Sequence, residues 1–117
     1  MEEILEVSML LDFYGQLITK RQYEILDLHY NNDCSFGEIA KEMNISRQGV
    51  YDNIKRGKAA LIELEEKLKL IRRFTEQKNK AKVILNLLEE IENSKLELEC
   101  RQKLENAKKA VVEIMED

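Results

Sequence analysis

No proline occurs anywhere in the 117 residues of this chain, and only four glycines do. Proline and glycine are the residues that interrupt helices most strongly, so a chain nearly free of both can run in long helices. Apolar residues also recur at intervals of three and four along much of the sequence, which is the period of an amphipathic helix. The sequence therefore predicts an all-α fold.

Helix starts can be placed from capping residues. A first helix is expected over about residues 2–14, ending before Gly15. Three later segments combine a capping side chain with an apolar stripe, and two of them have the spacing of a capping box. The predicted caps are Thr19 with Gln22, Ser35 with Glu38, and Ser46. An Asn-Asn-Asp turn at 31–33 separates the second helix from the third.

The fourth helix is predicted to be long. One apolar stripe continues for about six turns, at a helical period. Its members are Val50, Ile54, Leu61, Leu64, Leu68 and Ile71. A helix of this length would outrun a compact head and project from it. We therefore expect a head domain over residues 1–73 that includes this helix, and a C-terminal helical extension over residues 74–117.

Two further helices are expected in the extension. The first carries Ile84, Leu87, Leu88 and Ile91, and the second follows a break at Asn93-Ser94. A heptad seam runs along the second. Its members are Cys100, Leu104, Ala107, Val111 and Ile114. This seam either packs onto the long fourth helix or joins two copies of the chain as a homodimer.

The third and fourth helices have the dimensions of a helix-turn-helix. That motif needs a small residue where the helices touch, a residue that tolerates left-handed backbone in the turn, an apolar plug and inward β-branched residues. Ala40, Asn44, Ile45, Val50 and Ile54 fill these positions in that order. The expected fold is a helix-turn-helix head of the winged-helix-like class without the wing, followed by a long helix and C-terminal helices.

The fourth helix would offer the ligand contacts. With Val50 and Ile54 turned inward, five residues of suitable chemistry lie on the outer side or its flank. Arg47 and Gln48 can bond base edges, Lys55 and Arg56 suit phosphates, and Tyr51 could stack on an unpaired base. The predicted nucleic-acid-binding residues are Arg47, Gln48, Tyr51, Lys55 and Arg56.

Asp52 is discordant on such a face, because a carboxylate repels phosphate. It is either a local partner of Arg56 at i, i+4 or an acceptor of a cytosine amino group. A second basic strip follows, which is either a solvated helix end or a further phosphate-contacting surface. Its members are Lys69, Arg72, Arg73 and Lys78, with Lys80 and Lys82 beyond them.

Charge and composition exclude several other functions. The net charge is −4, which argues against indiscriminate binding of nucleic acid, although an acidic head and tail flank a basic middle. Cys34 and Cys100 lack metal-ligand spacing, and the single histidine, His29, is expected to be a structural or surface residue rather than a catalytic base. No catalytic, metal or cofactor motif is found, so we expect no enzyme. Without an apolar span or signal peptide, a cytoplasmic protein is expected.

Several stretches resemble a known family. The runs T-K-R-Q-Y-E-I-L-D-L-H-Y at 19–30 and S-F-G-E-I-A-K-E-M-N-I-S-R-Q-G-V-Y-D-N-I-K-R at 35–56 resemble region 4 of bacterial sigma factors. With F-Y-G-Q-L at 13–17 and E-E-K-L at 65–68, they are more similar to the YlxM family of small helix-turn-helix proteins. Tyr51-Asp52-Asn53 matches that family's pattern, whereas Gly49 departs from an expected alanine.

The resemblance implies a role in the signal recognition particle pathway, because YlxM proteins are typically encoded beside the GTPase of that particle. Two functions follow. The first is a nucleic-acid-binding regulator whose ligand is DNA or the RNA of the particle. The alternative is a protein-interaction module that binds the particle's GTPase without sequence-specific DNA binding.

Overall fold

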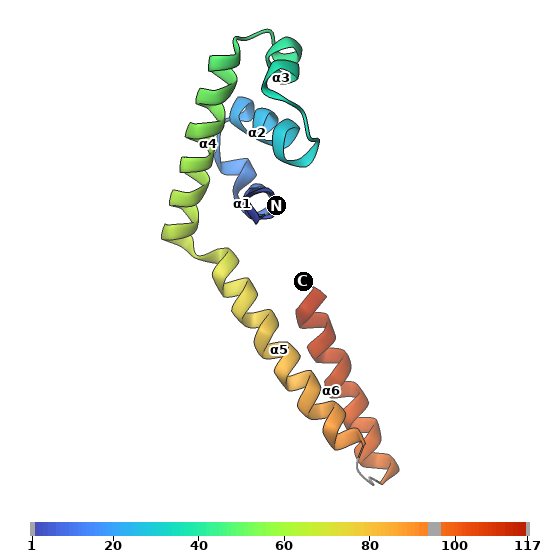
Figure 1. The fold of residues 1–117 in the computed structure, drawn as a ribbon. Helices are drawn as coiled ribbons and strands as arrows, with labels where there is room; N and C mark the ends of the chain where they lie inside the picture. Colours follow the sequence, from blue (N-terminus) through green and yellow to red (C-terminus); the bar gives the residue numbers. More distant parts are fainter. Residues whose placement is uncertain (1, 94–96, 117) are drawn as a thin grey trace. The chain divides into compact units, whose positions relative to one another are not determined.

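The computed structural model describes residues 2–93 and 97–116, and all six α-helices expected from the sequence lie among them (Figure 1). In chain order the elements are α1 (Glu2–Tyr14), the 3-10 turn η1 (Gly15–Leu17), α2 (Lys20–Leu26), the π-helical turn η2 (Asp27–Asn31), α3 (Phe36–Met43), α4 (Arg47–Leu68), α5 (Leu70–Glu92) and α6 (Leu98–Glu116). No strand occurs within the described ranges, which confirms the all-α prediction. The chain divides into two compact units, residues 1–71 and 72–117.

Side-chain caps set the starts of α2, α3 and α4. Thr19 Oγ1 accepts a hydrogen bond from the Gln22 N–H at 3.1 Å, and the Gln22 side chain accepts the Thr19 N–H at 3.2 Å. Ser35 and Glu38 form the same reciprocal pair. Ser46 Oγ accepts the backbone N–H three residues further on, at 2.9 Å. These hydrogen bonds confirm the three predicted caps. They could be predicted because a capping residue and its partner lie close together in the sequence.

The first unit is built around one hydrophobic core, to which four helices contribute. α4 packs against α1, α2 and α3, and each of these turns an apolar side toward it. The buried residues are Val7, Leu10, Leu11 and Tyr14 of α1, Ile25 and Leu26 of α2, Ile39 and Ala40 of α3, and Val50, Ile54 and Leu61 of α4. The helix-turn-helix is therefore held by a core that α1 completes.

α4 does not project from this core, so that prediction is wrong. Leu61 is 0% exposed within the core, and Leu64 and Ile71 pack against it. The helix also ends at Leu68, because Lys69 adopts left-handed backbone with φ 55°. The sequence does not reveal the cover of this stripe, because α1, which packs against α4, lies far away along the chain.

A hydrogen-bonded cluster holds the junction between α4 and α5. The buried Tyr14 hydroxyl donates to Glu65 Oε1 at 2.5 Å and accepts the Leu70 N–H at 3.1 Å. Glu65 Oε1 also accepts the Ile71 N–H at 3.0 Å. Two backbone donors in the first turn of α5, which have no partner inside that helix, are thereby satisfied. Burial, and then the hydrogen bond to Glu65, raise the pKa of Tyr14, so the hydroxyl keeps the proton that it donates.

Gly57 allows α4 to lie close to α2. A Cβ at this position would come 2.7 Å from Leu26 Cδ1, and Leu26 is itself fully buried. Because the core around Leu26 leaves little room for that methyl group to move, a larger residue would force the helices apart. Glycine inside a helix normally weakens it, but here it permits the packing.

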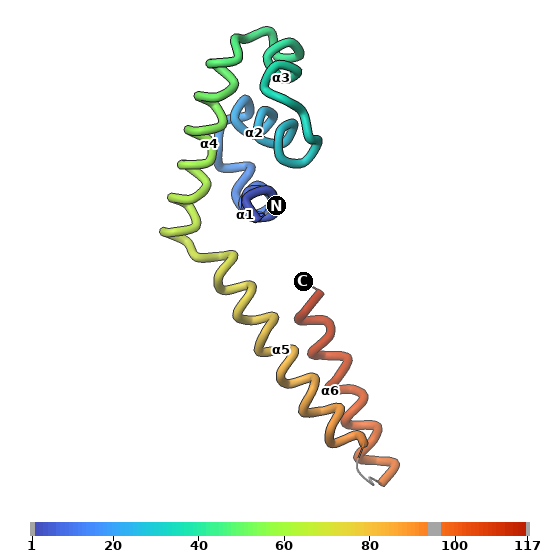
Figure 2. The backbone as a smooth tube through the Cα atoms, in the orientation of Figure 1, coloured from blue at the N-terminus to red at the C-terminus, as the bar shows by residue number. Residues whose placement is uncertain are grey.

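In the second unit, α5 and α6 form an antiparallel hairpin (Figures 1 and 2). Ala81 of α5 and Leu104 and Val111 of α6 are buried, and Lys108 Nζ of α6 lies 2.6 Å from a carboxylate oxygen of Glu92. The partner of α6 in this unit is α5, whereas the sequence left open packing onto the fourth helix or pairing with a second copy. The predicted break begins just after α5 ends, although its second residue, at 94, lies outside the described residues.

Candidate nucleic-acid interface

The helix-turn-helix of α3 and α4 has the predicted turn. Asn44 adopts left-handed backbone, with φ 56° and ψ 48°, and ends α3. The Ile45 N–H donates to the Ala40 carbonyl oxygen at 3.0 Å, which closes the turn. Ile45 packs against the core, in which Val50 and Ile54 are buried. All five residues singled out for this motif therefore take the positions expected of them.

The predicted contact residues all lie on α4, which presents them along its outer side. Arg47, Gln48, Lys55 and Arg56 are exposed, and Tyr51 is 46% exposed. Because Val50 and Ile54 fix the rotation of α4 about its axis, these side chains cannot turn into the core without breaking the packing. The structure thus brings together the set that the sequence proposed, on one rigid element.

Arg47 lies against the start of α3. A Cβ built on Gly37 would come 3.0 Å from Arg47 Nη2 and 3.3 Å from its Nε, so the guanidinium group covers this glycine. Glycine at position 37 leaves the space that the side chain occupies. The contact positions the Arg47 side chain beside the turn between α3 and α4. At this end of a recognition helix the first residues approach a ligand.

Asp52 does not pair with Arg56, so the local partner expected for it is wrong. The Asp52 carboxylate instead accepts a hydrogen bond from the Gln48 side-chain amide at 3.1 Å, one turn earlier on α4. Among the described residues, Arg56 makes no ion pair with Asp52. The amide can satisfy the half-buried carboxylate without a counter-charge, and Arg56 is left to solvent. The pairing engages Gln48, one of the two residues proposed to bond base edges.

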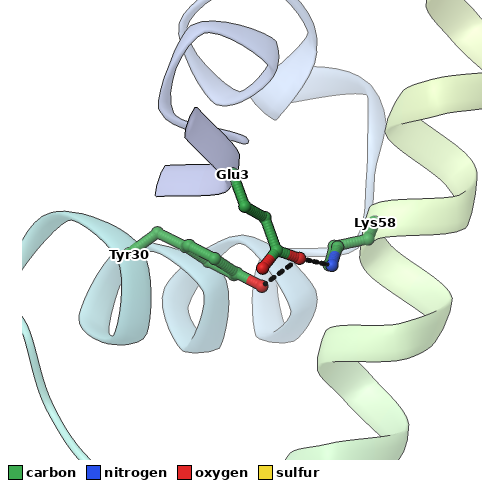
Figure 3. Close-up of polar contacts among 3 residues, drawn as sticks. All are labelled: Glu3, Tyr30 and Lys58. Atoms are coloured by element: carbon green, nitrogen blue, oxygen red, sulfur yellow. Dashed lines mark hydrogen bonds and ion pairs between the residues drawn. The ribbon is translucent and has the colours of Figure 1, made fainter. Parts of the chain in front are cut away.

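Three residues from separate elements meet beside this face, as Figure 3 shows. The Glu3 carboxylate of α1 forms an ion pair with Lys58 Nζ of α4 and accepts the Tyr30 hydroxyl of η2 at 3.4 Å. The hydrogen bond and charge of Lys58 lower the pKa of Glu3, and the hydrogen bond that Lys58 donates to Glu3 raises the pKa of Lys58. Sequence reasoning missed this group because Glu3 and Lys58 lie 55 residues apart, and neither belongs to a motif.

Comparison with protein families decides which helix-turn-helix group this is. The UPF0122 family model, described as "Putative helix-turn-helix protein, YlxM / p13 like", matches residues 1–110. The chain belongs to the UPF0122 family. This confirms the YlxM resemblance found in the sequence.

Relatives with the same family name occur in several bacteria. The UPF0122 protein of Acetivibrio thermocellus is 66% identical over 79 residues, which make up 68% of this chain and 68% of the relative. That of Thermoanaerobacter sp. (strain X514) is 47% identical over 78 residues, or 67% of each chain. That of Bacillus cereus (strain AH187) is 47% identical over 78 residues, or 67% of this chain and 71% of the relative.

His29 of this UPF0122 protein has a structural environment, as predicted. Its Nδ1 lies 2.9 Å from the Cys34 carbonyl oxygen, and its ring centroid lies 4.8 Å from that of Tyr30 and 5.0 Å from that of Phe36. Over residues 2–93 and 97–116, no three His, Cys, Asp or Glu side chains are grouped so that they could hold a metal ion. Cys34 and Cys100 are both free thiols.

The second basic strip of the UPF0122 chain consists of Lys69, Arg72, Arg73 and Lys78, and its members differ in environment. Arg72 Nε pairs with Glu76 at 3.1 Å, and Lys78 Nζ lies 4.8 Å from the centroid of the Phe74 ring. Arg73 and Lys69 are exposed. Some of this positive charge is thus compensated by neighbours on the same helix. None of the helices that the structure describes is both long and apolar enough to cross a membrane.

Proposed function

We propose that this UPF0122 protein is a cytoplasmic regulator, not an enzyme, and that it binds nucleic acid through its helix-turn-helix. The observation that carries the proposal is the outer side of α4. It presents five side chains suited to bases or phosphates, while two buried β-branched residues fix the helix on the core. The five are Arg47, Gln48, Tyr51, Lys55 and Arg56. Bidentate and charged contacts of this kind are what recognition helices use.

The ligand that we propose is DNA or the RNA of the signal recognition particle, with the protein acting in that particle's pathway. The link to the pathway rests on the resemblance to YlxM proteins. An extended polyanion could also use the second basic strip, of which Arg73 and Lys69 are exposed. Binding should then depend on neutralising phosphates rather than on apolar contact.

A salt-titrated binding assay tests the proposal, with duplex DNA and particle RNA as separate ligands. Affinity should fall steeply between about 50 and 200 mM salt, because phosphate contacts release counterions. Lys55→Glu with Arg56→Glu should abolish binding. Lys103→Glu with Lys109→Glu, at exposed positions of α6, makes the same change in net charge and should leave binding intact. A folded Lys55/Arg56 double variant that binds as well as the wild type would contradict the proposal.

A second candidate is a protein-interaction module for the GTPase of the signal recognition particle. It is favoured by the half-buried Asp52, which places a carboxylate on the recognition face and holds Gln48 in a hydrogen bond. The net charge of −4 suits a basic protein partner better than a polyanion. The same assay with the purified GTPase separates the two, since GTPase binding without any binding of nucleic acid would favour this candidate.

We also propose that the protein is a homodimer joined through the α5–α6 hairpin. Ile84, Leu87 and Ile91 are exposed along one side of α5, at i, i+3 and i+7. Ile114 of α6 is also exposed and lines the same shallow pocket as Ile84. These four residues form an outer apolar face. A second copy could cover it and turn two hairpins into a four-helix bundle. Of the predicted seam, Leu104 and Val111 are already used inside the hairpin.

A further inference from the structure

A groove runs along the flank of α4, beside the outer side of the recognition helix. Its volume is about 400 Å³. α4 lines one wall with Tyr51, Lys55, Lys58 and Ile62, which recur at the spacing of one helix face. Tyr30 of η2 and Phe36 of α3 form the opposite wall. Lys55 belongs to both the groove and the proposed phosphate-binding set, so a ligand on that set also meets the groove.

Aromatic rings dominate the groove. The ring centroids of Phe36 and Tyr51 lie 6.4 Å apart at an interplanar angle of 56°. Phe36 also contacts the His29 ring behind it, with centroids 5.0 Å apart, so this wall is supported by a second ring. Tyr51 is 46% exposed, so part of its side chain is accessible to an incoming group. An exposed ring on a supported aromatic surface is a stacking platform for a flat, apolar-faced ligand.

The two lysines of the groove have different partners. Lys58 forms its ion pair with Glu3 and lies 5.8 Å from the centroid of the Tyr30 ring, so its charge is already compensated. Lys55 is exposed and makes no ion pair with any residue in 2–93 or 97–116. Positive charge is thus available in the lining of the groove, together with the aromatic rings. A ligand with a flat ring and an adjacent anionic group matches this arrangement.

A duplex does not match it well. Bases in a duplex are stacked on one another and present only their edges, so they cannot reach Tyr51 or Phe36 with a ring face. The outer side of α4, which would contact base edges in a duplex, also carries the Asp52 carboxylate, which accepts a hydrogen bond from Gln48. Unpaired bases of RNA loops are splayed out and stack on aromatic side chains, while their phosphates remain available to lysine and arginine.

We propose that the groove lined by Tyr30, Phe36, Tyr51 and Lys55 binds unpaired bases of single-stranded RNA. Tyr51 stacks on a base, Phe36 supports Tyr51, and Lys55 contacts the neighbouring phosphate. The proposal rests on the proposed nucleic-acid binding and specifies the form of the ligand. The groove should therefore make the protein bind unpaired RNA segments in preference to any duplex.

The test uses the full chain and a 12-nucleotide RNA of mixed sequence without self-complementarity, with 2-aminopurine at one position. The matching RNA duplex, single-stranded DNA and DNA duplex serve as competing ligands. The single-stranded RNA should bind several-fold more tightly than either duplex. Tyr51→Leu should weaken this binding about tenfold, because stacking on an aromatic ring is lost. Tyr51→Phe keeps the ring and should bind within about twofold of the wild type.

Stacking has its own signature in this experiment. Emission from 2-aminopurine should fall when the probe binds the wild type or Tyr51→Phe, and should fall much less with Tyr51→Leu at saturating protein. Thermal unfolding of each variant checks the fold. Duplex binding at least as tight as single-strand binding, or a folded Tyr51→Leu variant with unchanged affinity and quenching, would overturn the groove assignment. Tighter binding of the DNA strand than of the RNA strand would overturn the choice of RNA.

Failure of the broader proposal looks different. If the wild type binds none of the four nucleic acids at low salt, nucleic-acid binding itself is wrong, and the groove assignment is overturned with it. If it binds duplexes in a way that depends on Lys55 and Arg56 but not on Tyr51, only the groove assignment is overturned.

Discussion

The hydrogen bond from Gln48 to Asp52 changes what single side chains on α4 can offer a ligand. From the sequence alone, Gln48 is expected to hydrogen-bond base edges, and Arg56 is the local partner considered for Asp52. In the structure the two satisfy each other, and Arg56 is left available for phosphate. The residue types and the helix period were sufficient to predict which side chains lie on the outer side of α4. They could not predict this pairing, because one carboxylate had two possible partners at i±4.

Replacing the charge at Asp52 tests its effect on binding. Asp52→Asn keeps a carbonyl oxygen that can accept the Gln48 hydrogen bond and removes the repulsion of phosphate. Binding of duplex DNA should therefore tighten by up to about 1 kcal/mol, with little change in thermal stability. The measurement is a titration at low salt, where unscreened charge has most effect. Weaker binding by the asparagine variant would instead identify Asp52 as a direct ligand contact.

The Glu3–Lys58 pair should make stability depend on pH. Lys58 lowers the pKa of Glu3 from its ordinary value of 4.5, so the pair stabilises the folded state above that value. The contribution is lost as the pH falls through the lowered pKa of the folded state. The raised pKa of Lys58 sets the limit at high pH. The stabilisation that Lys58 contributes is fully present below its ordinary pKa, and it is lost as the pH rises through the raised pKa of the folded state.

Glu3→Gln should therefore lower the melting temperature most near neutral pH and least in strong acid. Glu2→Gln is the matched control, since Glu2 is exposed and forms no ion pair with the rest of the described chain. Melting curves recorded from acid to neutral pH give the comparison. A constant difference between Glu3→Gln and the wild type across that range would show that the pair does not cause the effect.

Helices illustrate which elements a sequence can specify by itself. The starts of α2, α3 and α4 were predictable because a cap and its partner lie within three residues. The end of α4 was not, because Lys69 carries no signal for left-handed backbone and the apolar stripe continues past it to Ile71. The close approach at Gly57 was also missed, because it depends on where Leu26 lies in space.

Tyr14 links α1 to the α4–α5 junction through its hydroxyl, so Tyr14→Phe should weaken that junction. The substitution keeps the buried ring and leaves Glu65 and the Leu70 N–H without this partner. Loss of a buried hydrogen-bonded group of this kind costs about 1–2 kcal/mol of unfolding free energy. Urea denaturation measures it, with Tyr23→Phe at an exposed position as the control. Equal stability of Tyr14→Phe and the wild type would remove the proposed role of the hydroxyl.

For the molecule as a whole, the sequence specified more of the fold than of the surfaces. It located the helix-turn-helix and its outer residues, because one helix period determines both. It could not locate the aromatic groove, whose walls come from η2, α3 and α4. Nor could it divide the C-terminal seam between residues that pack inside the hairpin and residues that remain outside it, since that depends on how α5 and α6 are rotated.

Self-association should depend on the outer apolar face of the hairpin. Leu87→Glu with Ile91→Glu places two charges on that face and should convert a dimer into a folded monomer, because burying them would be costly. Leu98→Glu with Val112→Glu introduces the same charges at exposed apolar positions of α6 outside the face, and should leave the dimer intact. Sedimentation at high micromolar concentration measures the mass. A wild type that is monomeric there would refute the dimer.

Synthesis from the N-terminus gives the packing of α1 on α4 a further consequence. α1 is made before α4, yet it packs against that helix, and Tyr14 bonds to Glu65, which lies 51 residues further along. Until that part of the chain has left the ribosome, α1 has no permanent cover for its apolar side. During this interval the nascent protein exposes apolar surface, which makes it prone to aggregate with other chains. We expect the core of the first unit to form late and in a single step, when the second half of α4 has left the ribosome.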